Sequence, residues 1–502
     1  MAINFSLSGK QFLQDGADVY ALFVEQDFDF KKLSSELLAL FPHLETYCKE
    51  QDFSGKEQSN LSIPVMHEQK LVYILLAGLG KKEKKVDIEN YRRALARIVR
   101  FMQRVKVNNL ALHLPLANLF GVTDQVLGQE TATIAHMTDY IFDTFKEQEG
   151  GEKDIEIILV LQKHNRAALQ KGIKNGEIIG NSINDAREWV NLPANVLRPD
   201  ELASQAKQIA KEHDLGCTIF NEKKINELGM GGLAAVSSGS EQECRFVILE
   251  YKTDKKNAQT IGFVGKGITY DSGGLSIKPS KSMETMKEDM AGGAAVIAAM
   301  KALAQFKPAV NIIAIIPLAE NLPSGVAAKP GDIVRMYNGK TVEIKNTDAE
   351  GRLILGDALA YMAKNYKPVM MFDLATLTGA CQHALGPFFS GLFGVDESII
   401  KKVEKAAQIA GEPVWRLPLT KDYEKAMDCP VADLCNIANP KFMAGATTAA
   451  VFLKNFVNDI PWAHLDIAGT SFNVPDIPYQ RAEMATGVGV RLLIELALQW
   501  AK

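Results

Sequence analysis

Short apolar runs rich in β-branched residues alternate with helical stretches along the chain, and this alternation constrains the fold more than any other feature. The run Asn311–Pro317 (NIIAIIP) is apolar at every position after its asparagine, rather than at every second one. A strand of this kind needs cover on both faces, which is typical of a parallel sheet between layers of helices. At 502 residues the chain is too long for one ordinary core. The sequence therefore predicts an α/β fold with two domains.

A long and largely polar helical stretch, His164–Trp189, separates two blocks of this alternation. Pro193 follows closely, and proline cannot continue a helix. We predict a smaller N-terminal α/β domain over residues 1–165, a connecting helix over residues 166–190, and a larger C-terminal domain over residues 191–502 with a mostly parallel sheet flanked by helices. The predicted strands are Val19–Val24, Leu71–Ala77, Leu110–Leu114, Ile155–Leu161, Phe246–Tyr251, Thr260–Val264, Ile312–Leu318, Val369–Leu374 and Trp462–Ile467, and further helices are predicted over Ile88–Val105, within Met283–Phe306 and over Ala485–Trp500.

Charge and cysteine content narrow the class of protein. The formal net charge of −4 supplies no general positive field for a nucleic acid or an anionic membrane surface. The first residues lack a signal peptide pattern, and no apolar run reaches the length of a membrane span. The six cysteines include no CxxC pair, so we expect reduced thiols and a cytoplasmic location. A nucleic-acid contact stays open only for a loose basic cluster, which is more simply a solvated turn and helix face: Lys81–Lys85, Arg92, Arg93, Arg97 and Arg100.

Lys266, Asp271 and Lys278 stand in a glycine-rich loop expected directly after a predicted strand. Ligands bind at the carboxyl ends of strands in open α/β sheets, so these charges indicate a site. A phosphate-binding Walker loop is excluded, because Gly262–Gly267 is two residues short of the required spacing and lacks the hydroxyl after the lysine. The dinucleotide pattern GxGxxG fails as well, since Tyr270 replaces its third glycine.

Asp348, Glu350 and Arg352 follow one another at a spacing of two, which in an extended loop points all three side chains the same way. A helix is predicted from Leu353 onward, and the positive end of its dipole suits an anion. Asp289 falls within a predicted helix of small apolar residues, where a buried carboxylate needs a partner. Each residue alone is more simply a turn, cap or ion-pair residue. Together they favour a hydrolase with a carboxylate-bound metal.

No histidine lies between Lys266 and Arg352, so a metal there must rely mainly on oxygen ligands. Such ligands leave Mg²⁺, Mn²⁺ and Zn²⁺ open. We interpret His464, within a predicted strand, as a core or supporting residue rather than a ligand.

The segment Asn346–Leu353 (NTDAEGRL) resembles the signature octapeptide of the leucyl aminopeptidase family, the cytosolic dinuclear metallo-aminopeptidases. The resemblance covers the whole second block, whereas the first third is similar only in length and α/β pattern. The other positions and segments at matching intervals are Lys266, Asp271, Lys278, Asp289, Asn191–Asn195, Asp373–Gly379 and His464–Gly469.

This resemblance implies an enzyme that removes N-terminal residues, preferring leucine and other apolar ones, from peptide substrates. It further implies two divalent metal ions per subunit, Mn²⁺ or Zn²⁺ with Mg²⁺ and Co²⁺ as alternatives. Asp271 and Glu350 would bridge the two ions. Lys266 and Asp289 would complete the more tightly held site and Asp348 the more exchangeable one.

The same resemblance implies that Lys278 polarises the substrate carbonyl and stabilises the gem-diolate, while Arg352 holds a bicarbonate that acts as general base. A lysine binds a metal only as its neutral amine, so the pKa of Lys266 should be lowered by the metals and by burial. Lys278 should instead stay protonated, to offset negative charge that develops on oxygen.

The substrate pocket is implied less sharply. Met286 and Ala468 would line an apolar pocket for the N-terminal side chain, although Met286 also suits a plain helix core. Leu377 and Gly379 would offer backbone groups to the substrate. The family resemblance implies a homohexamer. Two other classes stay open, a dinuclear phosphoesterase and a nucleic-acid-binding regulator.

Overall fold

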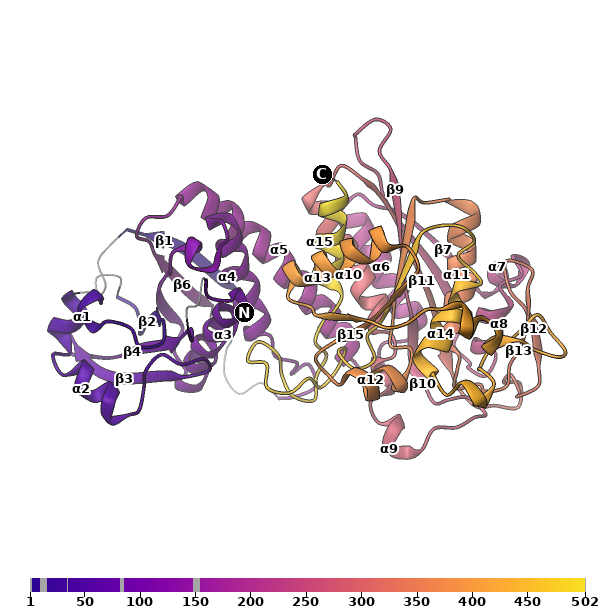
Figure 1. Cartoon of the computed structure of the whole chain (residues 1–502), viewed down its shortest axis with the longest axis horizontal. Helices are drawn as coiled ribbons and strands as arrows, with labels where there is room; N and C mark the ends of the chain where they lie inside the picture. Colours follow the sequence, from indigo (N-terminus) through magenta and orange to yellow (C-terminus); the bar gives the residue numbers. More distant parts are fainter. Residues whose placement is uncertain (1, 10–15, 34, 82–84, 148–153, 502) are drawn as a thin grey trace. The chain divides into compact units, whose positions relative to one another are not determined.

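The computed structural model describes residues 2–9, 16–33, 35–81, 85–147 and 154–501. The chain divides into two compact units (Figure 1). Unit 1 comprises Met1–Asn181 with Asp476–Gln480, and unit 2 comprises Ser182–Pro475 with Arg481–Lys502. The predicted α/β class, with two domains and mostly parallel sheets flanked by helices, is confirmed. Among the described helices, none combines the length and apolar character that crossing a bilayer requires.

Unit 1 is built on a six-stranded sheet with the order β1-β6-β5-β2-β4-β3. All its neighbouring strands are parallel except the β3–β4 hairpin. Helix α5 begins in unit 1 and ends in unit 2. The elements are β1 Ile3–Ser8, β2 Val19–Val24, α1 Ser35–Leu40, α2 Leu44–Glu50, β3 Asn60–His67, β4 Lys70–Gly78, α3 Ile88–Val105, β5 Asn109–His113, α4 Asp124–Asp139, β6 Ile155–Val160 and α5 Arg166–Asn191.

Helix α3 spans the range predicted for it, because its two ends are well defined. The Asp87 carboxylate caps the first turn by accepting from the Glu89 N–H, and Lys106 ends the helix with a φ of 58°. One arginine of this helix belongs to the core: Arg92 is 2% exposed and pairs with Glu130 at 2.7 Å. Of the candidate basic stretch 81–85, residues 82–84 lie outside the described residues.

Unit 2 holds a nine-stranded sheet with the order β16-β15-β18-β14-β9-β11-β8-β7, to which β10 adds by pairing with β11. The strands of this sheet are β7 Gly216–Phe220, β8 Arg245–Tyr251, β9 Thr260–Gly265, β10 Gly267–Asp271, β11 Asn311–Asn321, β14 Met370–Ala375, β15 Ser390–Gly394, β16 Val414–Arg416 and β18 Trp462–Asp466. A small second sheet is formed by β12 Ile333–Arg335, β13 Thr341–Glu343 and β17 Leu434–Cys435. The predicted strands are confirmed, with ends that shift by at most a few residues.

Helices cover both faces of the large sheet, as the apolar strands require (Figure 1). On one side α10 packs with α6 and α15, and on the other α11 packs with α8 and α14. Alternate strand residues such as Ile313 and Ile315 join the α11 side of the core. The helices are α6 Pro199–Glu212, α7 Glu222–Glu227, α8 Gly231–Ser237, α9 Ser280–Met283, α10 Ala291–Phe306, α11 Gly351–Asn365, α12 Gly379–Leu385, α13 Glu397–Ala410, α14 Gly445–Lys454 and α15 Val490–Trp500.

Four neighbouring strands at the centre of this sheet, β11, β9, β14 and β18, run parallel. Their carboxyl ends therefore meet at one edge. The residues that stand there, at the strand ends or just beyond, are Asn321, Lys266, Thr376 and Asp466. All four are buried. The fold thus gathers polar side chains from four separate stretches of chain at the place where α/β sheets bind ligands.

Two predictions for the stretch between β9 and α10 are wrong. The first part of the glycine-rich stretch expected as a loop after β9 forms the strand β10, Gly267–Asp271, whereas residues 272–279 form a loop as expected. Gly267 permits this, since a Cβ there would lie 2.5 Å from the Leu318 side chain of the neighbouring strand. Asp289 lies before helix α10 rather than within it, at the end of the 3₁₀ turn Met286–Glu288. The helix starts later because Gly293 packs against the end of β9, where its N–H donates to the Lys266 carbonyl at 2.7 Å.

Candidate metal centre

Lys266 is among the most deeply enclosed charges of the cluster, with a side chain that is 3% exposed, as are those of Asp271 and Glu350. Its Nζ lies 2.7 Å from Asp289 Oδ1 and 2.9 Å from Glu350 Oε1, and donates to the Thr376 carbonyl at 2.9 Å. The Thr376 hydroxyl also donates to Asp289 Oδ1, at 2.8 Å. One strand end therefore supplies the amine, and a neighbouring strand end orients both the amine and a carboxylate.

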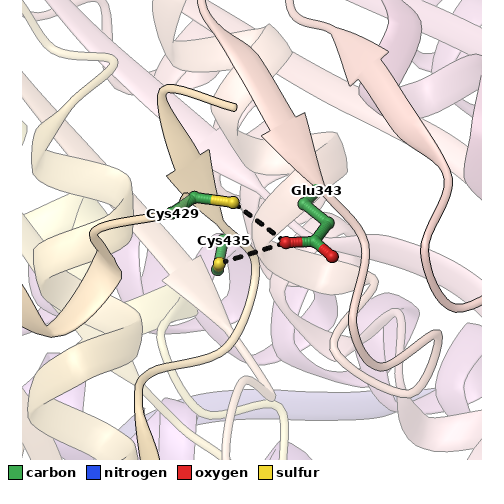
Figure 2. Close-up of side chains that lie close together, drawn as sticks. All are labelled: Glu343, Cys429 and Cys435. Atoms are coloured by element: carbon green, nitrogen blue, oxygen red, sulfur yellow. Dashed lines mark hydrogen bonds between the residues drawn. The ribbon is translucent and has the colours of Figure 1, made fainter. Parts of the chain in front are cut away.

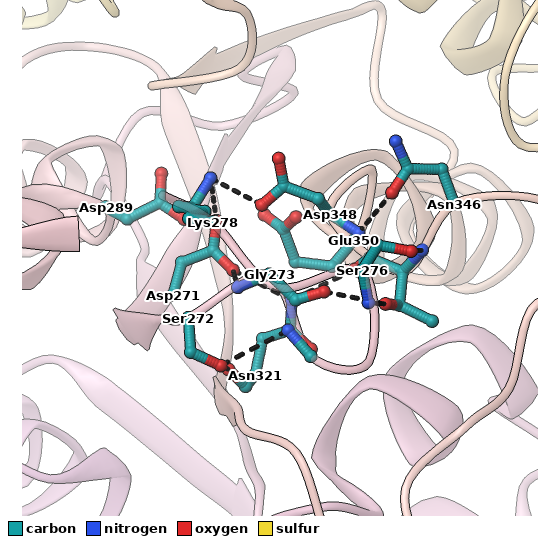
Figure 3. A network of polar contacts seen from close by, with 12 residues as sticks. Asp271, Ser272, Gly273, Ser276, Lys278, Asp289, Asn321, Asn346, Asp348 and Glu350 are labelled. Carbon is teal, nitrogen blue, oxygen red and sulfur yellow. Dashed lines mark hydrogen bonds and ion pairs between the residues drawn. The ribbon is translucent and has the colours of Figure 1, made fainter. Parts of the chain in front are cut away.

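Lys278 bridges the other half of the cluster (Figure 3). Its Nζ lies 2.8 Å from Asp271 Oδ2 and 2.5 Å from Asp348 Oδ1. Asp271, Asp348 and Glu350 each place a carboxylate oxygen within 4.8 Å of the other two. Four carboxylates, counting Asp289, thus face two lysines, so −4 meets +2 among these side chains. The remaining negative charge suits added cations.

Two close backbone approaches make the cluster possible. A Cβ on Gly351 would lie 2.7 Å from Lys266 Nζ, so only glycine lets helix α11 begin beside the amine. Gly273 adopts a φ of 88°, and a Cβ there would lie 2.9 Å from Asp348 Oδ1. A side chain at either position would collide with the charged groups.

Asn321, at the end of β11, fixes Asp271. Its Nδ2 donates to Asp271 Oδ1 at 2.8 Å and to the Thr347 carbonyl at 3.0 Å. The Gly273 N–H donates to the same carboxylate oxygen at 2.9 Å. Asp271 is therefore oriented by neutral donors on one oxygen and by Lys278 on the other.

The loop that carries the remaining acids is held by Asn436, which follows β17 and is fully buried. Its Oδ1 accepts from the Lys345 N–H at 2.8 Å and from the Asn346 N–H at 3.3 Å. Its Nδ2 donates to the carbonyls of Asn346 at 2.6 Å and Ala349 at 3.3 Å. The Asn436 carbonyl accepts from Arg352 Nη1 at 2.9 Å. The Asn436 side chain and its backbone carbonyl thus hold the segment from Lys345 to Arg352 in place.

The expectation that Asp348, Glu350 and Arg352 point the same way is wrong for the arginine. Helix α11 begins at Gly351, two residues earlier than predicted, and Glu350 is its N-cap residue with helical φ and ψ of −83° and −39°. The extended conformation in which every second side chain points the same way therefore ends at Glu350. The carboxylates of Asp348 and Glu350 lie close together, whereas the Arg352 side chain extends to the Asn436 carbonyl.

Burial governs the ionisation of the acids. It raises the pKa of Asp271 to about 6, with repulsion from Glu350 adding to the effect. It also raises the pKa of Asp289 and that of Asp348. Burial opposes the charge of Glu350 too, but the two lysines outweigh it and lower the pKa of this carboxyl.

Burial favours the neutral amine of Lys266, but the carboxylates of Asp289, Glu350 and Asp271 outweigh it and raise its pKa. The pKa of Lys278 is raised in the same way, against the effect of burial. The protein groups alone therefore keep both lysines charged. The lowered pKa expected for Lys266 depends on the added charge of cations.

The structure places the expected substrate residues around this edge of the sheet. Met286 opens the 3₁₀ turn that leads to Asp289 and is half-buried. The N–H groups of Leu377 and Ala468 both donate to the Asp466 carboxylate at 3.2 Å. Leu377 therefore has only its carbonyl left to offer a substrate. Gly379 is exposed at the start of α12.

Sequence reasoning missed four supporting residues, namely Asn321, Asn436, Thr376 and Asp466. Asn321 could have been found, because it is a polar residue at the carboxyl end of an apolar strand. Thr376 lies in a segment that was matched to the family, but only as part of a longer run. Asn436 carries no such signal, since it lies 84 residues from Arg352 in a stretch without strong periodicity.

The fold and the cluster together define a class, an α/β metallohydrolase with a carboxylate–lysine centre at the carboxyl edge of its parallel sheet. Comparison with known proteins gives the family. The family model described as "Cytosol aminopeptidase family, catalytic domain" matches residues 184–494, and the model of the same family's N-terminal domain matches residues 21–149. The chain belongs to the cytosol aminopeptidase family. Membership supports a metal-dependent hydrolase with N-terminal aminopeptidase activity.

Curated relatives and solved structures agree with this. A probable cytosol aminopeptidase of Desulforapulum autotrophicum is 40% identical, covering 89% of this chain and 88% of its own length. One from Chlorobaculum tepidum is 39% identical, covering 98% and 96%. The structure of the bottromycin maturation enzyme BotP in complex with Mn is 32% identical with a TM-score of 0.85, covering 97% of this chain and 100% of that one.

Proposed function

We propose that this protein removes N-terminal leucine and other apolar residues from peptides, as a leucyl aminopeptidase with two divalent cations per subunit. The observation that carries the proposal is the convergence of buried carboxylates and lysines, in a member of this family, where the negative charge exceeds the positive. The residues proposed to hold the cations are Lys266, Asp271, Asp289, Asp348 and Glu350.

The donor set fits such cations. Asp289 Oδ2 is buried without a hydrogen-bond partner among the described residues, although its carboxylate is ionisable. When bound by these residues, two divalent ions would make a water nucleophilic near neutral pH and would polarise the scissile carbonyl. We propose Mn²⁺ first, because the similar BotP is described in complex with Mn, while Zn²⁺, Mg²⁺ and Co²⁺ suit the same oxygen-rich set.

Lys278 is proposed as the electrophile that stabilises negative charge on the substrate oxygen. Its side chain is 15% exposed, more than that of Lys266, so it can face a substrate. Its raised pKa keeps it protonated at neutral pH. A fixed cation of this kind acts where charge develops, which is what transition-state stabilisation requires.

Arg352 is proposed to hold a bicarbonate ion that serves as general base. The guanidinium is buried, and its Nε has no hydrogen-bond partner among the described residues. Burial lowers its pKa to about 10, which still leaves it charged at neutral pH. A buried cation with a spare donor is a suitable seat for a small anion.

For the substrate we propose that Met286 and Ala468 line the pocket of the N-terminal side chain and that Leu377 and Gly379 contribute backbone groups. The Met286 and Ala468 side chains are half-buried and apolar, so they would favour an apolar N-terminal residue. A homohexamer and a cytoplasmic location complete the proposal. Light scattering of the purified chain tests the assembly, and a monomer would contradict it.

The activity is tested with leucine p-nitroanilide and Mn²⁺ or Zn²⁺, before and after exhaustive chelation. We expect hydrolysis that is lost on chelation and restored by metal. A phosphate ester assayed in parallel should stay intact. Hydrolysis of the ester alone would favour the phosphoesterase alternative, and peptidase activity that survives chelation would exclude the mechanism.

The role of Arg352 is tested separately. Arg352→Ala should lower kcat while the bound metal content remains near that of the unaltered protein. Arg335→Ala, which changes an exposed arginine of β12, serves as the control. Loss of metal from the Arg352 variant would show that its assigned role is wrong.

A further inference from the structure

A second group of convergent donors lies in the small sheet of unit 2 (Figure 2). Both Cys429 Sγ and Cys435 Sγ point to the same oxygen of Glu343, at 2.9 Å and 3.6 Å. One donor atom from each of the three residues lies within 4.8 Å of the other two. None of them belongs to the catalytic cluster.

The backbone brings these donors together. Strands β13 and β17 are parallel, and Glu343 pairs directly with Cys435, so their side chains share a face. Cys429 comes from the segment after the 3₁₀ helix Lys421–Met427. Cys435 is 3% exposed, while Cys429 and Glu343 are half-buried. The group is therefore held by two strands and a loop, yet a small ion can reach it.

Charge and donor type point to one class of ligand. Two thiolates and a carboxylate carry −3, and Lys345 Nζ lies 3.6 Å from Glu343 Oε2 and carries +1. A divalent cation brings the sum to zero as the two thiol protons leave to solvent. Sulfur donors with one carboxylate suit Zn²⁺ and related thiophilic ions rather than Mg²⁺.

We propose that Cys429, Cys435 and Glu343 bind one thiophilic divalent cation, Zn²⁺ or an ion of similar preference, distinct from the catalytic metals. Three protein ligands leave one coordination position for water. This is a site of a different chemical class from the carboxylate–lysine cluster, and it does not depend on the proposed activity.

The site is connected to the catalytic loop through a single residue. Asn436 directly follows Cys435, and its N–H donates to the Glu343 carbonyl at 3.0 Å. The same asparagine braces Asn346 and Ala349 and receives Arg352. A cation that fixes Glu343 and Cys435 would therefore stabilise the loop that carries Asp348 and Glu350.

The test uses the full chain, reduced and verified to carry all six cysteines as thiols, with the catalytic site first saturated with Mn²⁺. Co²⁺ is then titrated, and the thiolate-to-cobalt charge-transfer band in the near ultraviolet is followed. The catalytic cluster offers carboxylates and lysines, so such a band reports only a cysteine site. We expect a band that saturates at one equivalent and is abolished by excess Zn²⁺.

Matched variants decide the assignment. Cys435→Ser and Cys429→Ser should each abolish or strongly diminish the band, and Glu343→Gln should weaken Co²⁺ binding by about tenfold or more. Cys217→Ser, which alters a half-buried thiol in β7, should leave the band unchanged. Because Cys435 is buried, the half-exposed Cys429 gives the variant least prone to misfold. No band in the reduced protein, or a band that persists in Cys429→Ser at full strength, would overturn the proposal.

The connection to the loop has its own readout. In the unaltered protein with Mn²⁺ present, Zn²⁺ should slow hydrogen exchange at the Lys345 and Asn346 amides, which donate to Asn436. The effect should vanish in Cys429→Ser. Equal exchange with and without Zn²⁺, in a protein that shows the cobalt band, would refute the coupling. Neither measurement uses peptide hydrolysis, so both stand apart from the proposed activity.

Discussion

The two clusters of donor atoms in unit 2 differ in donor type, in burial and in the sheet that carries them, but they share one neighbouring residue. The catalytic cluster has four carboxylates and two lysines, is largely buried, and lies at the edge of a nine-stranded sheet. The cysteine cluster has two thiols and one carboxylate with a half-exposed lysine at its rim, beside a three-stranded sheet. Asn436 contacts the backbone of both. The two clusters therefore favour different cations, because their donor atoms differ. The backbone around Asn436 nevertheless connects the positions of the two clusters.

The largest expected effect concerns the lysine that faces the substrate. Lys278→Met should lower kcat for leucine p-nitroanilide by about 100- to 1000-fold, since one stabiliser of developing charge is removed. Metal content should not fall, because Asp271 and Asp348 lose a competing cation. Lys281→Met, in the short exposed helix α9 nearby, is the control and should retain activity. A Lys278 variant with normal kcat would remove this residue from the mechanism.

The next effect tests the residue that both clusters share. Asn436→Ala leaves the backbone groups of Lys345, Asn346 and Ala349 without their partner. Each lost buried hydrogen bond costs about 1–3 kcal/mol, so denaturant unfolding should show a clear loss of stability. We expect kcat to fall by about tenfold or more, because the loop bearing the metal ligands loosens.

A matched change separates this from a general effect of losing an asparagine. Asn365→Ala alters an exposed residue at the end of α11 and should change neither quantity by much. If the Asn436 variant kept both its stability and its kcat, the two clusters would not be connected as the contacts indicate.

These residues also show how far the sequence alone could reach. Lys266 and Asp348 could be singled out because they lie in continuous segments with unusual charge. Glu343 and Cys435 could not, since they are 92 residues apart and meet through strands of three and two residues. Hydrophobic periodicity cannot detect strands so short.

Helix starts were the other weak point. Helix α15 was expected from Ala485 but begins at Val490. Gly487 and Gly489 precede it with φ values of 72° and 93°, which are incompatible with a right-handed helix. The apolar pattern continues through these residues, so only the backbone conformation reveals the break.

The pH dependence of cation binding gives a smaller contrast. The pKa of Asp271 in the folded protein is about 6, above its ordinary 3.8. The stability that protonated Asp271 contributes to the metal-free protein is therefore present below pH 3.8 and is lost as the pH rises through about 6. Mn²⁺ needs the ionised carboxylate, so the rise in Tm on adding Mn²⁺ should grow as pH increases from about 5 to about 8. Zn²⁺ at the cysteine cluster displaces two thiol protons and should show a steeper dependence. Thermal unfolding with Mn²⁺ alone, and with Zn²⁺ added to the Mn²⁺-saturated protein, measures both, and identical slopes would contradict the difference in donor chemistry.

The smallest effect comes from the lysine at the rim of the cysteine cluster. Lys345 is 42% exposed and lies 3.6 Å from Glu343, so its repulsion of an incoming cation is screened by solvent. Lys345→Gln should therefore strengthen Co²⁺ binding there by only about two- to fivefold. The kcat for peptide hydrolysis should not change, because the Lys345 backbone N–H that binds Asn436 is retained. Lys329→Gln makes the same charge change beside Asp332 and should leave Co²⁺ affinity as it was. Weaker binding in the Lys345 variant would mean that this lysine orients Glu343 rather than opposing the cation, and the charge balance proposed for the site would have to be revised.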